Sequence, residues 1–178
     1  AYFPRADKTL PAEDVLEAGA DKVSTSSAAF RDPDVIGRMV KEFGGEKITV
    51  AIDVDRNPDL PSGYEVWIDG GRTATGADAV EWAKKINGFG VQVILPTSKA
   101  TDGARTGFDL PLIRAIAGAT DAQVVASGGA GTMEHFAQAA EAGATILLAA
   151  SVFHFGHIKI GELKKYLKEK GFETAVGS

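Results

Sequence analysis

The sequence contains no cysteine among its 178 residues, which excludes disulfides, zinc–thiolate sites, iron–sulfur clusters and a thiol nucleophile. It also has little positive charge. The 19 Lys and Arg residues against 24 Asp and Glu residues give a net charge of −5, the wrong sign for a nucleic-acid-binding protein. No apolar run reaches the roughly 18 residues of a membrane span, and the opening AYFPRADKTL lacks the apolar core of a signal peptide. We therefore expect a soluble, cytoplasmic protein.

Short apolar, β-branched runs alternate with amphipathic stretches along the chain. This pattern is typical of βα units whose parallel sheet is buried on both faces. The predicted strands are residues 21–25, 48–54, 91–95, 123–126 and 145–150, and the predicted helices are residues 32–43, 76–87, 110–119, 132–142 and 160–170. Residues 64–68, which precede Asp-Gly-Gly, predict a small antiparallel hairpin inserted after the second strand. We expect the last four strands to be parallel and adjacent in chain order.

Two segments repeat one arrangement of helix end, strand and small-residue turn. They are AGADKVSTSS at 18–27 and AGATILLAAS at 142–151, which start 124 residues apart. If four βα units fill this interval, each takes about 31 residues, and eight units would need about 250, the usual size of a (β/α)8 barrel. The repeat therefore favours a barrel whose first units precede this chain, although Ala-Gly-Ala is also a common helix stop.

Glycine-rich and small-residue turns predict anion binding. The segment ASGGAGTMEHF at 126–136 ends a strand and opens into a helix, where backbone amides and the helix dipole attract an anion. A second turn at 149–151 follows the last strand, and barrels commonly hold a phosphate between the loops after their last two strands. The turn STSS at 24–27 could hold a second phosphate or cap a helix. For each turn, a connection without a ligand is the alternative.

Two carboxylates are expected at the C-terminal face, where barrel enzymes keep their acids and bases. Asp53 closes the apolar run VAID, and a buried strand tolerates a charge only where it is paired or at an open rim. Asp102 lies in the polar loop 97–105, where an ordinary Asp-Gly turn is the competing interpretation. Lys99 and Arg105 of the same loop could contact a substrate phosphate or be solvated.

The remaining polar and aromatic candidates are interpreted as structural. His135, His154 and His157 show no metal-ligand spacing, so we expect neither a metal nor another cofactor. Trp67 and Trp82 are expected to pack on a hairpin face and a helix face respectively.

Six segments together resemble the cyclase subunit of imidazole glycerol phosphate synthase. They are AGADKVS (18–24), VAID (50–53), DGARTGFD (102–109), ASGGAGTMEHF (126–136), AASVFHF (149–155) and GELKKYL (161–167). The resemblance runs from about residue 12 to the C-terminus and leaves residues 1–11 unassigned. It implies a single TIM-barrel-like α/β domain over residues 1–178, here a partial (β/α)8 barrel of about five parallel strands with an inserted hairpin.

The resemblance also implies an activity and a set of site residues. The activity is that of a lyase of histidine biosynthesis, which uses ammonia from a glutaminase (glutamine amidotransferase) partner to cyclise a bis-phosphorylated aminoimidazole carboxamide ribonucleotide. Asp102 corresponds to the family's general acid/base, and Asp53 to its supporting aspartate. One phosphate is expected at Gly103, Gly128, Gly129, Ala150 and Ser151, with Thr97 and Ser127 lining the pocket, and the other at Ser26 and Ser27.

Some family features are missing. The catalytic aspartate of the first strand and the glycine-rich loop of the third have no counterpart in residues 1–10. At the ammonia entrance Lys22 is present, but Val93 stands where a glutamate is expected. These departures favour an alternative, a degenerate or engineered barrel fragment that binds phosphate without catalysis. Another isomerase of phosphorylated sugars on the same barrel fits DGARTGFD and SVFHF less well. Because a partial barrel has open sheet edges, we expect self-association or a complementary barrel fragment.

Overall fold

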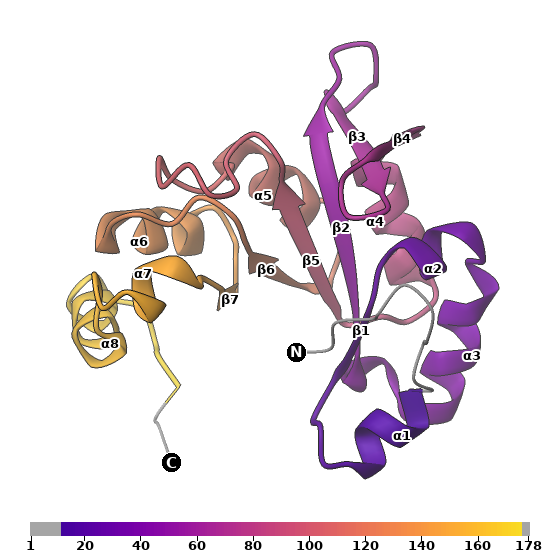
Figure 1. Cartoon of the computed structure of the whole chain (residues 1–178), viewed down its shortest axis with the longest axis horizontal. Helices are drawn as coiled ribbons and strands as arrows, with labels where there is room; N and C mark the ends of the chain where they lie inside the picture. Colours follow the sequence, from indigo (N-terminus) through magenta and orange to yellow (C-terminus); the bar gives the residue numbers. More distant parts are fainter. Residues whose placement is uncertain (1–11, 176–178) are drawn as a thin grey trace.

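The β-sheet at the centre of the computed structural model has the strand order β4-β3-β2-β5-β6-β7, with β1 also paired to β2 (Figure 1). The structure describes residues 12–175, so residues 1–11 and 176–178 lie outside it. The strands are β1 (Val23–Thr25), β2 (Ile48–Arg56), β3 (Tyr64–Ile68), β4 (Thr73–Asp78), β5 (Val93–Ser98), β6 (Gln123–Ala126) and β7 (Ile146–Leu147). The helices are α1 (Ala12–Glu17), α2 (Ser27–Arg31), α3 (Asp34–Phe43), the 3-10 turn η1 (Gly45–Lys47), α4 (Ala79–Gly88), α5 (Leu110–Ala117), α6 (Met133–Glu141), α7 (Ser151–His154) and α8 (Ile160–Glu169).

Five of these strands form the predicted parallel array. β1, β2, β5, β6 and β7 pair in parallel and in chain order, so the expectation that the last four are neighbours is confirmed. The molecule is a partial TIM barrel. The inserted hairpin is also confirmed, since β3 runs antiparallel to β2 and β4 antiparallel to β3.

β2, with nine residues, is long enough to pair with three neighbouring strands, β1, β3 and β5. One edge of β2 pairs with β5 over its whole middle. The other edge is shared: its first residues pair with β1 from Ile48 to Val50, and its last residues pair with the hairpin from Asp53 to Arg56. The hairpin therefore stands at the C-terminal end of β2, above the short β1 (Figure 1).

The hairpin also explains two wrong boundaries. The helix predicted at 76–87 begins only at Ala79, because the preceding residues form β4 and the Asp78 carboxylate caps the helix by accepting from the amides of Val80 and Glu81. Asp53 does not close its strand, since pairing with β3 extends β2 three residues further, to Arg56. The strand predicted at 145–150 is shortened to β7; the Leu148 amide still donates to the Ala126 carbonyl of β6, and α7 begins at Ser151.

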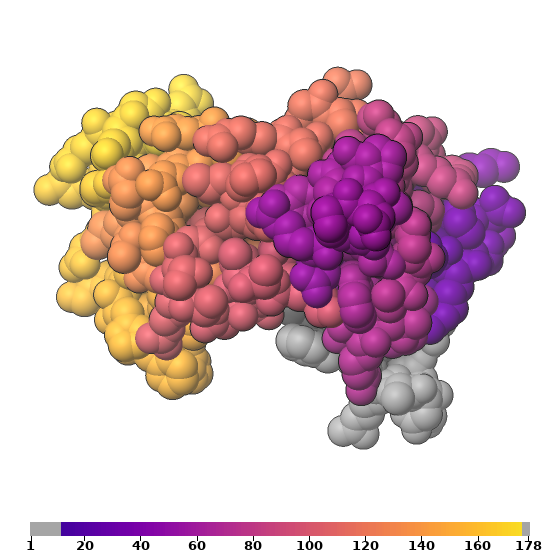
Figure 2. All heavy atoms as spheres, turned by 90° about the horizontal axis from the view of Figure 1, so that it is seen from above, coloured from indigo at the N-terminus to yellow at the C-terminus, as the bar shows by residue number. Residues whose placement is uncertain are grey.

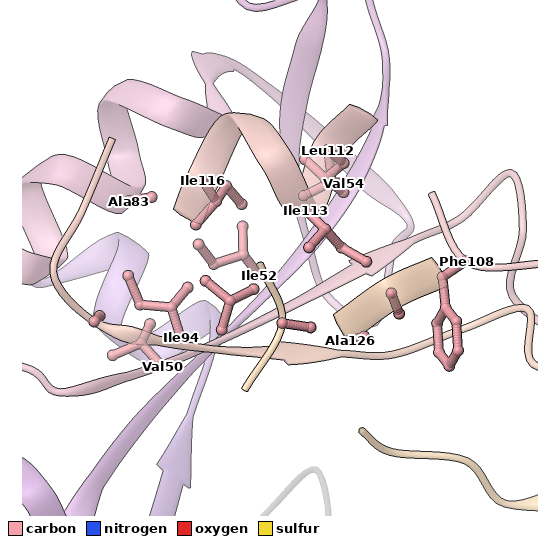
Figure 3. Packing of buried hydrophobic residues seen from close by; sticks show 14 of the residues in the cluster. Val50, Ile52, Val54, Ala83, Ile94, Phe108, Leu112, Ile113, Ile116 and Ala126 are labelled. Atoms are coloured by element: carbon pink, nitrogen blue, oxygen red, sulfur yellow. The ribbon is translucent and has the colours of Figure 1, made fainter. Parts of the chain in front are cut away.

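The core lies between the sheet and the helices outside it. Along β2, Val50, Ile52 and Val54 are buried, whereas the alternate positions Ala51 and Asp53 are only partly buried. A strand shows opposite faces at successive residues, so the first set faces the helices and the second faces the inside of the partial barrel. Figure 3 shows Ile52 of β2 and Ile94 of β5 beside Ile113 and Ile116 of α5.

The C-terminal ends of the parallel strands lie at the top of Figure 1 and face the viewer in Figure 2. On this face the loop between β5 and α5 lies beside the later loops that follow β6 and β7. No helix among residues 12–175 is long and apolar enough to cross a membrane.

Candidate functional site

A cavity of about 240 Å³ opens at the C-terminal ends of β5, β6 and β7. Three loops line it. The β5–α5 loop contributes Asp102, Gly103 and Arg105; the β6–α6 loop contributes Ser127, Gly128, Gly129 and Ala130; and the segment after β7 contributes Leu148, Ala149, Ala150 and Ser151. Seven of the site residues predicted from the sequence are thus brought together: Asp102, Gly103, Ser127, Gly128, Gly129, Ala150 and Ser151.

Glycines allow two of these loops to touch through their backbones. Gly129 has φ 106°, and its carbonyl accepts a hydrogen bond from the Gly107 amide at 2.8 Å. A Cβ atom on Gly129 would lie 2.1 Å from the Gly107 carbonyl oxygen, and one on Gly131 would lie 2.2 Å from the Arg105 carbonyl oxygen. Any side chain at either position would therefore push the β5–α5 loop away from the β6–α6 loop and open the cavity wall.

His135 holds the turn that leads into α6. Its Nδ1 atom accepts hydrogen bonds from the Gly131 and Thr132 amides, at 3.1 and 3.3 Å. The interpretation of His135 as structural thus agrees with its contacts. Since these two amides already have an acceptor, an anion in the cavity would be recognised by the preceding residues, Gly128 and Gly129, which line it.

Arg105 supplies positive charge to the cavity lining. Its backbone has φ 57°, a left-handed conformation that a non-glycine residue adopts infrequently. The guanidinium Nη1 lies 3.3 Å from Nε2 of His157, in the loop between α7 and α8. This contact joins the β5–α5 loop, which carries Arg105, to the loop after α7, which carries His157.

Asp102 forms part of the cavity wall. Its amide donates to the Ser98 carbonyl at 3.0 Å, which folds the loop back over the end of β5. Its backbone lies against Gly128, where a Cβ atom would be 3.3 Å from the Cα of Asp102. The Thr101 hydroxyl donates to the Gly128 carbonyl at 3.3 Å and fixes the same contact. A carboxylate is therefore held beside the turn expected to bind phosphate.

Asp53 and Thr97 lie next to the cavity and do not line it. Asp53 pairs in register with Trp67 on one side and Thr97 on the other, and Thr97 pairs with Ser127. These four residues form one row across β3, β2, β5 and the end of β6, on the inner face. Burial raises the pKa of Asp53, and the charge of Asp102 raises it further, while Lys99 and the Gly71 amide lower it.

Ser26 and Ser27 lie apart from the cavity. The Ser27 hydroxyl accepts a hydrogen bond from the Asp69 amide at 2.9 Å, so it is engaged by the turn between β3 and β4. Ser26 immediately precedes α2, a helix of five residues. β1 is separated from β5–β7 by β2, which is why its turn faces the hairpin and lines no part of this cavity.

The sequence analysis missed a buried network behind the site. Asp109 is 6% exposed, and its carboxylate accepts from the Tyr64 hydroxyl at 2.7 Å, the Ser98 hydroxyl at 3.0 Å and Arg56 at 3.2 Å. It also caps α5 through the Leu112 amide at 3.2 Å. Burial raises the pKa of Tyr64, and the hydrogen bond from its hydroxyl to Asp109 raises it further. An Asp directly before a helix starting Leu-Pro was the available signal, since Asp is a favoured N-cap.

Lys99 is also placed differently from either expectation. Its Nζ atom lies 3.2 Å from the ring centroid of Trp67 and 3.3 Å from Oδ2 of Asp55. It is neither part of the cavity lining nor freely solvated, because its side chain is only 28% exposed. Within residues 12–175, no group of three or more Asp, Glu or His side chains could hold a metal ion.

Comparison with known proteins supplies the context for this geometry. A family model described as "Histidine biosynthesis protein" matches residues 8–159. The relatives named "Imidazole glycerol phosphate synthase subunit HisF" include that of Nocardia farcinica, 51% identical over 159 residues, or 87% of this chain. Those of Pyrobaculum aerophilum and Thermobifida fusca are each 48% identical, over 91% and 89% of this chain. The chain spans 62–63% of the length of these relatives.

Proposed function

Because the chain belongs to the histidine biosynthesis protein family, we propose that it carries the cyclase step of imidazole glycerol phosphate synthesis. The substrates are ammonia and a bis-phosphorylated aminoimidazole carboxamide ribonucleotide. The enzyme class is a lyase, and no cofactor takes part. The supporting observation is one cavity that has the glycine-rich turn of the β6–α6 loop on one wall and the Asp102 carboxylate on another.

The cavity suits a phosphate group for three reasons. Its turn contains Gly128 and Gly129, where backbone amides can approach an anion without interference from side chains. Ser151 adds a hydroxyl from the opposite loop, at the start of α7. Arg105 adds a positive charge to the lining. One substrate phosphate therefore binds here, in the position that (β/α)8 barrels commonly use.

Asp102 is the proposed general acid/base. A phosphate in the cavity would fix the ribonucleotide beside the Asp102 carboxylate, on the same wall as Gly103. Proton transfer by a positioned carboxylate contributes about 10²–10⁴-fold to a rate. Asp53 is the supporting carboxylate in the neighbouring strand. The second phosphate is proposed for the turn at Ser26 and Ser27, where the Ser27 hydroxyl accepts from the Asp69 amide and can donate its own proton to a phosphate oxygen.

The proposed partners follow from the sheet edges and from the opposite end of the barrel. β1 and β7 end the parallel array, and Leu148 beside β7 is 42% exposed. We propose that these edges are covered by complementary barrel units or by a second copy of the chain. A glutaminase subunit would deliver ammonia at the opposite end of the barrel, where the family carries a ring of charges. In this chain Val93, buried at the start of β5, supplies no charge there, and the Lys22 ammonium donates to the Glu46 carbonyl.

Turnover by this chain with complementary front βα units tests the proposal. We expect the chain alone to bind the bis-phosphorylated ribonucleotide and to turn it over poorly with free ammonia. Added front units should restore turnover, and Asp102→Asn should then lower kcat by about 10²–10⁴-fold. The matched control is Asp121→Asn, at an exposed position remote from the cavity lining. Full activity of the Asp102→Asn variant would show that another residue is the acid/base.

A second candidate is a non-catalytic phosphate-binding protein. The observation that favours it is that Asp102 is the carboxylate in the described cavity lining, with Asp53 outside it. Ring closure needs an acid and a base on different sides of the substrate. Phosphate binding without turnover after complementation would support this candidate over the enzyme.

A further inference from the structure

Lys99 is held on three sides at the end of β5. Its ammonium lies 3.2 Å from the Trp67 ring centroid and 3.3 Å from the Asp55 carboxylate. Its methylene groups lie against the hairpin turn, 3.4–3.6 Å from the place where Gly71 would carry a Cβ atom. Its amide donates to the Val54 carbonyl at 2.8 Å, which continues the pairing of β5 with β2. This lysine is thus ordered, in contrast to a flexible surface lysine.

The register places Lys99 on the same face as Asp53. Asp53 is paired with Trp67 of the hairpin and with Thr97, which lies two residues before Lys99. Because side chains at alternate residues share a face, the ring that contacts Lys99 and the carboxylate of Asp53 are neighbours on the inner face. The charge of Lys99 acts on Asp53 accordingly, and it lowers the pKa of Asp53 against the effects of burial and of Asp102.

The other charged side chains near Asp53 are either acidic or paired with one another. Asp55 of β2 is the ion-pair partner of Lys99, and the negative charge of Asp102 in the β5–α5 loop raises the pKa of Asp53. The hairpin turn contributes the Gly71 amide, which donates to Asp53. The turn's own charged residue Asp69 pairs with Arg31 at 2.5 Å. Arg72 donates to the Asp69 carbonyl. Lys99 is therefore the positive charge on the inner face beside Asp53, while Arg105 is the positive charge in the cavity lining beside Asp102.

Burial of Trp67 leaves one polar group without a partner, so this side chain is expected to do more than fill space. Its indole Nε1 is buried and has no hydrogen-bond partner among the described residues. A buried donor without an acceptor is unfavourable, and its presence in the folded protein calls for an explanation. The cation–π contact with Lys99 provides one, because an electron-rich indole face is the strongest aromatic partner for an ammonium group.

We propose that Lys99 is a positioning residue, gripped by Trp67 and Asp55, whose ammonium keeps the Asp53 carboxylate ionised beside Asp102. A fixed cation on the same face as a carboxylate favours the ionised form of that carboxylate. Asp102, which lines the cavity, is then the carboxylate that exchanges a proton with the ligand, while Asp53 outside the lining stays charged. The first statement concerns the charge of Asp53 alone, and the second rests on the proposed function.

Carboxyl NMR of the chain tests the first statement without any activity. With 13C-labelled aspartate, the Asp53 resonance is assigned by its loss in Asp53→Asn and followed through a pH titration. Lys99→Met, which keeps the length of the side chain and removes its charge, should move the midpoint of Asp53 to higher pH. Lys99→Arg should restore it. If Lys99→Met does not fold, Lys99→Gln, which also removes the charge and leaves Trp67 in place beside Asp53, should move the midpoint in the same direction.

Lys85→Met is the matched control. Lys85 also lies over a tryptophan, 5.7 Å from the ring centroid of Trp82 on α4, remote from the cavity lining. An unchanged Asp53 midpoint in Lys99→Met, or an equal shift in Lys85→Met, would overturn the proposal. In the complemented enzyme, the acidic limb of the kcat/KM profile should move to higher pH in Lys99→Met and stay in place in Lys99→Arg. An absence of turnover in the parent protein would overturn the proposed function, while the NMR result would still decide the charge of Asp53.

Discussion

The Tyr64 hydroxyl donates a 2.7 Å hydrogen bond to the Asp109 carboxylate, 45 residues further along the chain. The bond joins the first residue of β3 to the N-cap of α5. Arg56 adds a second link, since its guanidinium bonds Asp109 at 3.2 Å and lies 4.6 Å from the Tyr64 ring centroid. The inserted hairpin is thereby fastened to the barrel at the level of the site, and the Trp67 and Gly71 that surround Lys99 are fastened with it.

Replacement of Asp109 by Ala should destabilise the protein by about 2–4 kcal/mol, because a helix cap is lost and two buried hydroxyl groups, those of Tyr64 and Ser98, lose their acceptor. The free energy of unfolding from urea titration measures this. Asp121→Ala, at an exposed position, should change it by less than about 0.5 kcal/mol. If Asp109→Ala also lowered the free energy of unfolding by less than about 0.5 kcal/mol, the hydrogen bonds of Asp109 would contribute nothing to stability.

Inorganic phosphate should raise the melting temperature of the parent chain, because a ligand that binds only the folded state stabilises it. Gly129→Val should abolish this shift, since its Cβ atom would lie 2.1 Å from the Gly107 carbonyl oxygen and displace a cavity wall. Gly161→Ala is the control, because a Cβ atom there meets open space on α8. If Gly129→Val folds and keeps the full shift, the anion binds at another place.

Asp53→Asn should stabilise the protein at neutral pH. The pKa of Asp53 is raised above its ordinary value of 3.8 by burial and by Asp102, so ionisation of this group costs stability in the folded state. The cost is absent below pH 3.8, where the carboxyl is protonated in both the folded and unfolded states, and it grows as the pH rises through the raised pKa. Urea titrations of both proteins across this range provide the measurement. A gain that is constant with pH, or a loss at neutral pH, would contradict the assignment.

The open edge at β7 should cause association in solution. Ile146 and Leu147 form this edge and are only partly buried, and Leu148 next to them is exposed. Ile146→Lys should lower the mass observed by analytical ultracentrifugation, because a lysine on an edge strand opposes pairing with another chain. Ile160→Lys, at an exposed apolar position on α8, should leave the mass unchanged. A parent chain that is a monomer at all concentrations would count against covered edges.

The glycine-rich turn shows what the local sequence can predict about the site. The sequence SGGAG before a helix predicts a turn that admits an anion, and the structure places Ser127, Gly128 and Gly129 in the lining of one cavity. These residues share one cavity because consecutive parallel strands deliver their loops to one end of a barrel. The second turn, at Ser26 and Ser27, has similar local chemistry, but it lies across β2 from the cavity and Ser27 is engaged by the hairpin.

The sequence by itself determined the alternation of strands and helices and the presence of a hairpin, because these depend on the spacing of apolar and turn residues among near neighbours. The parallel order of the strands follows from that alternation, since short right-handed connections join the strands of successive βα units. Only the tertiary structure decided where the hairpin pairs. That pairing extends β2 beyond Asp53 and turns residues 76–78 from helix into strand. It also brings Trp67 over Lys99 and Tyr64 onto Asp109. These contacts join residues 32 and 45 positions apart, and no local pattern encodes them, since their energy arises only when two distant segments share a buried surface.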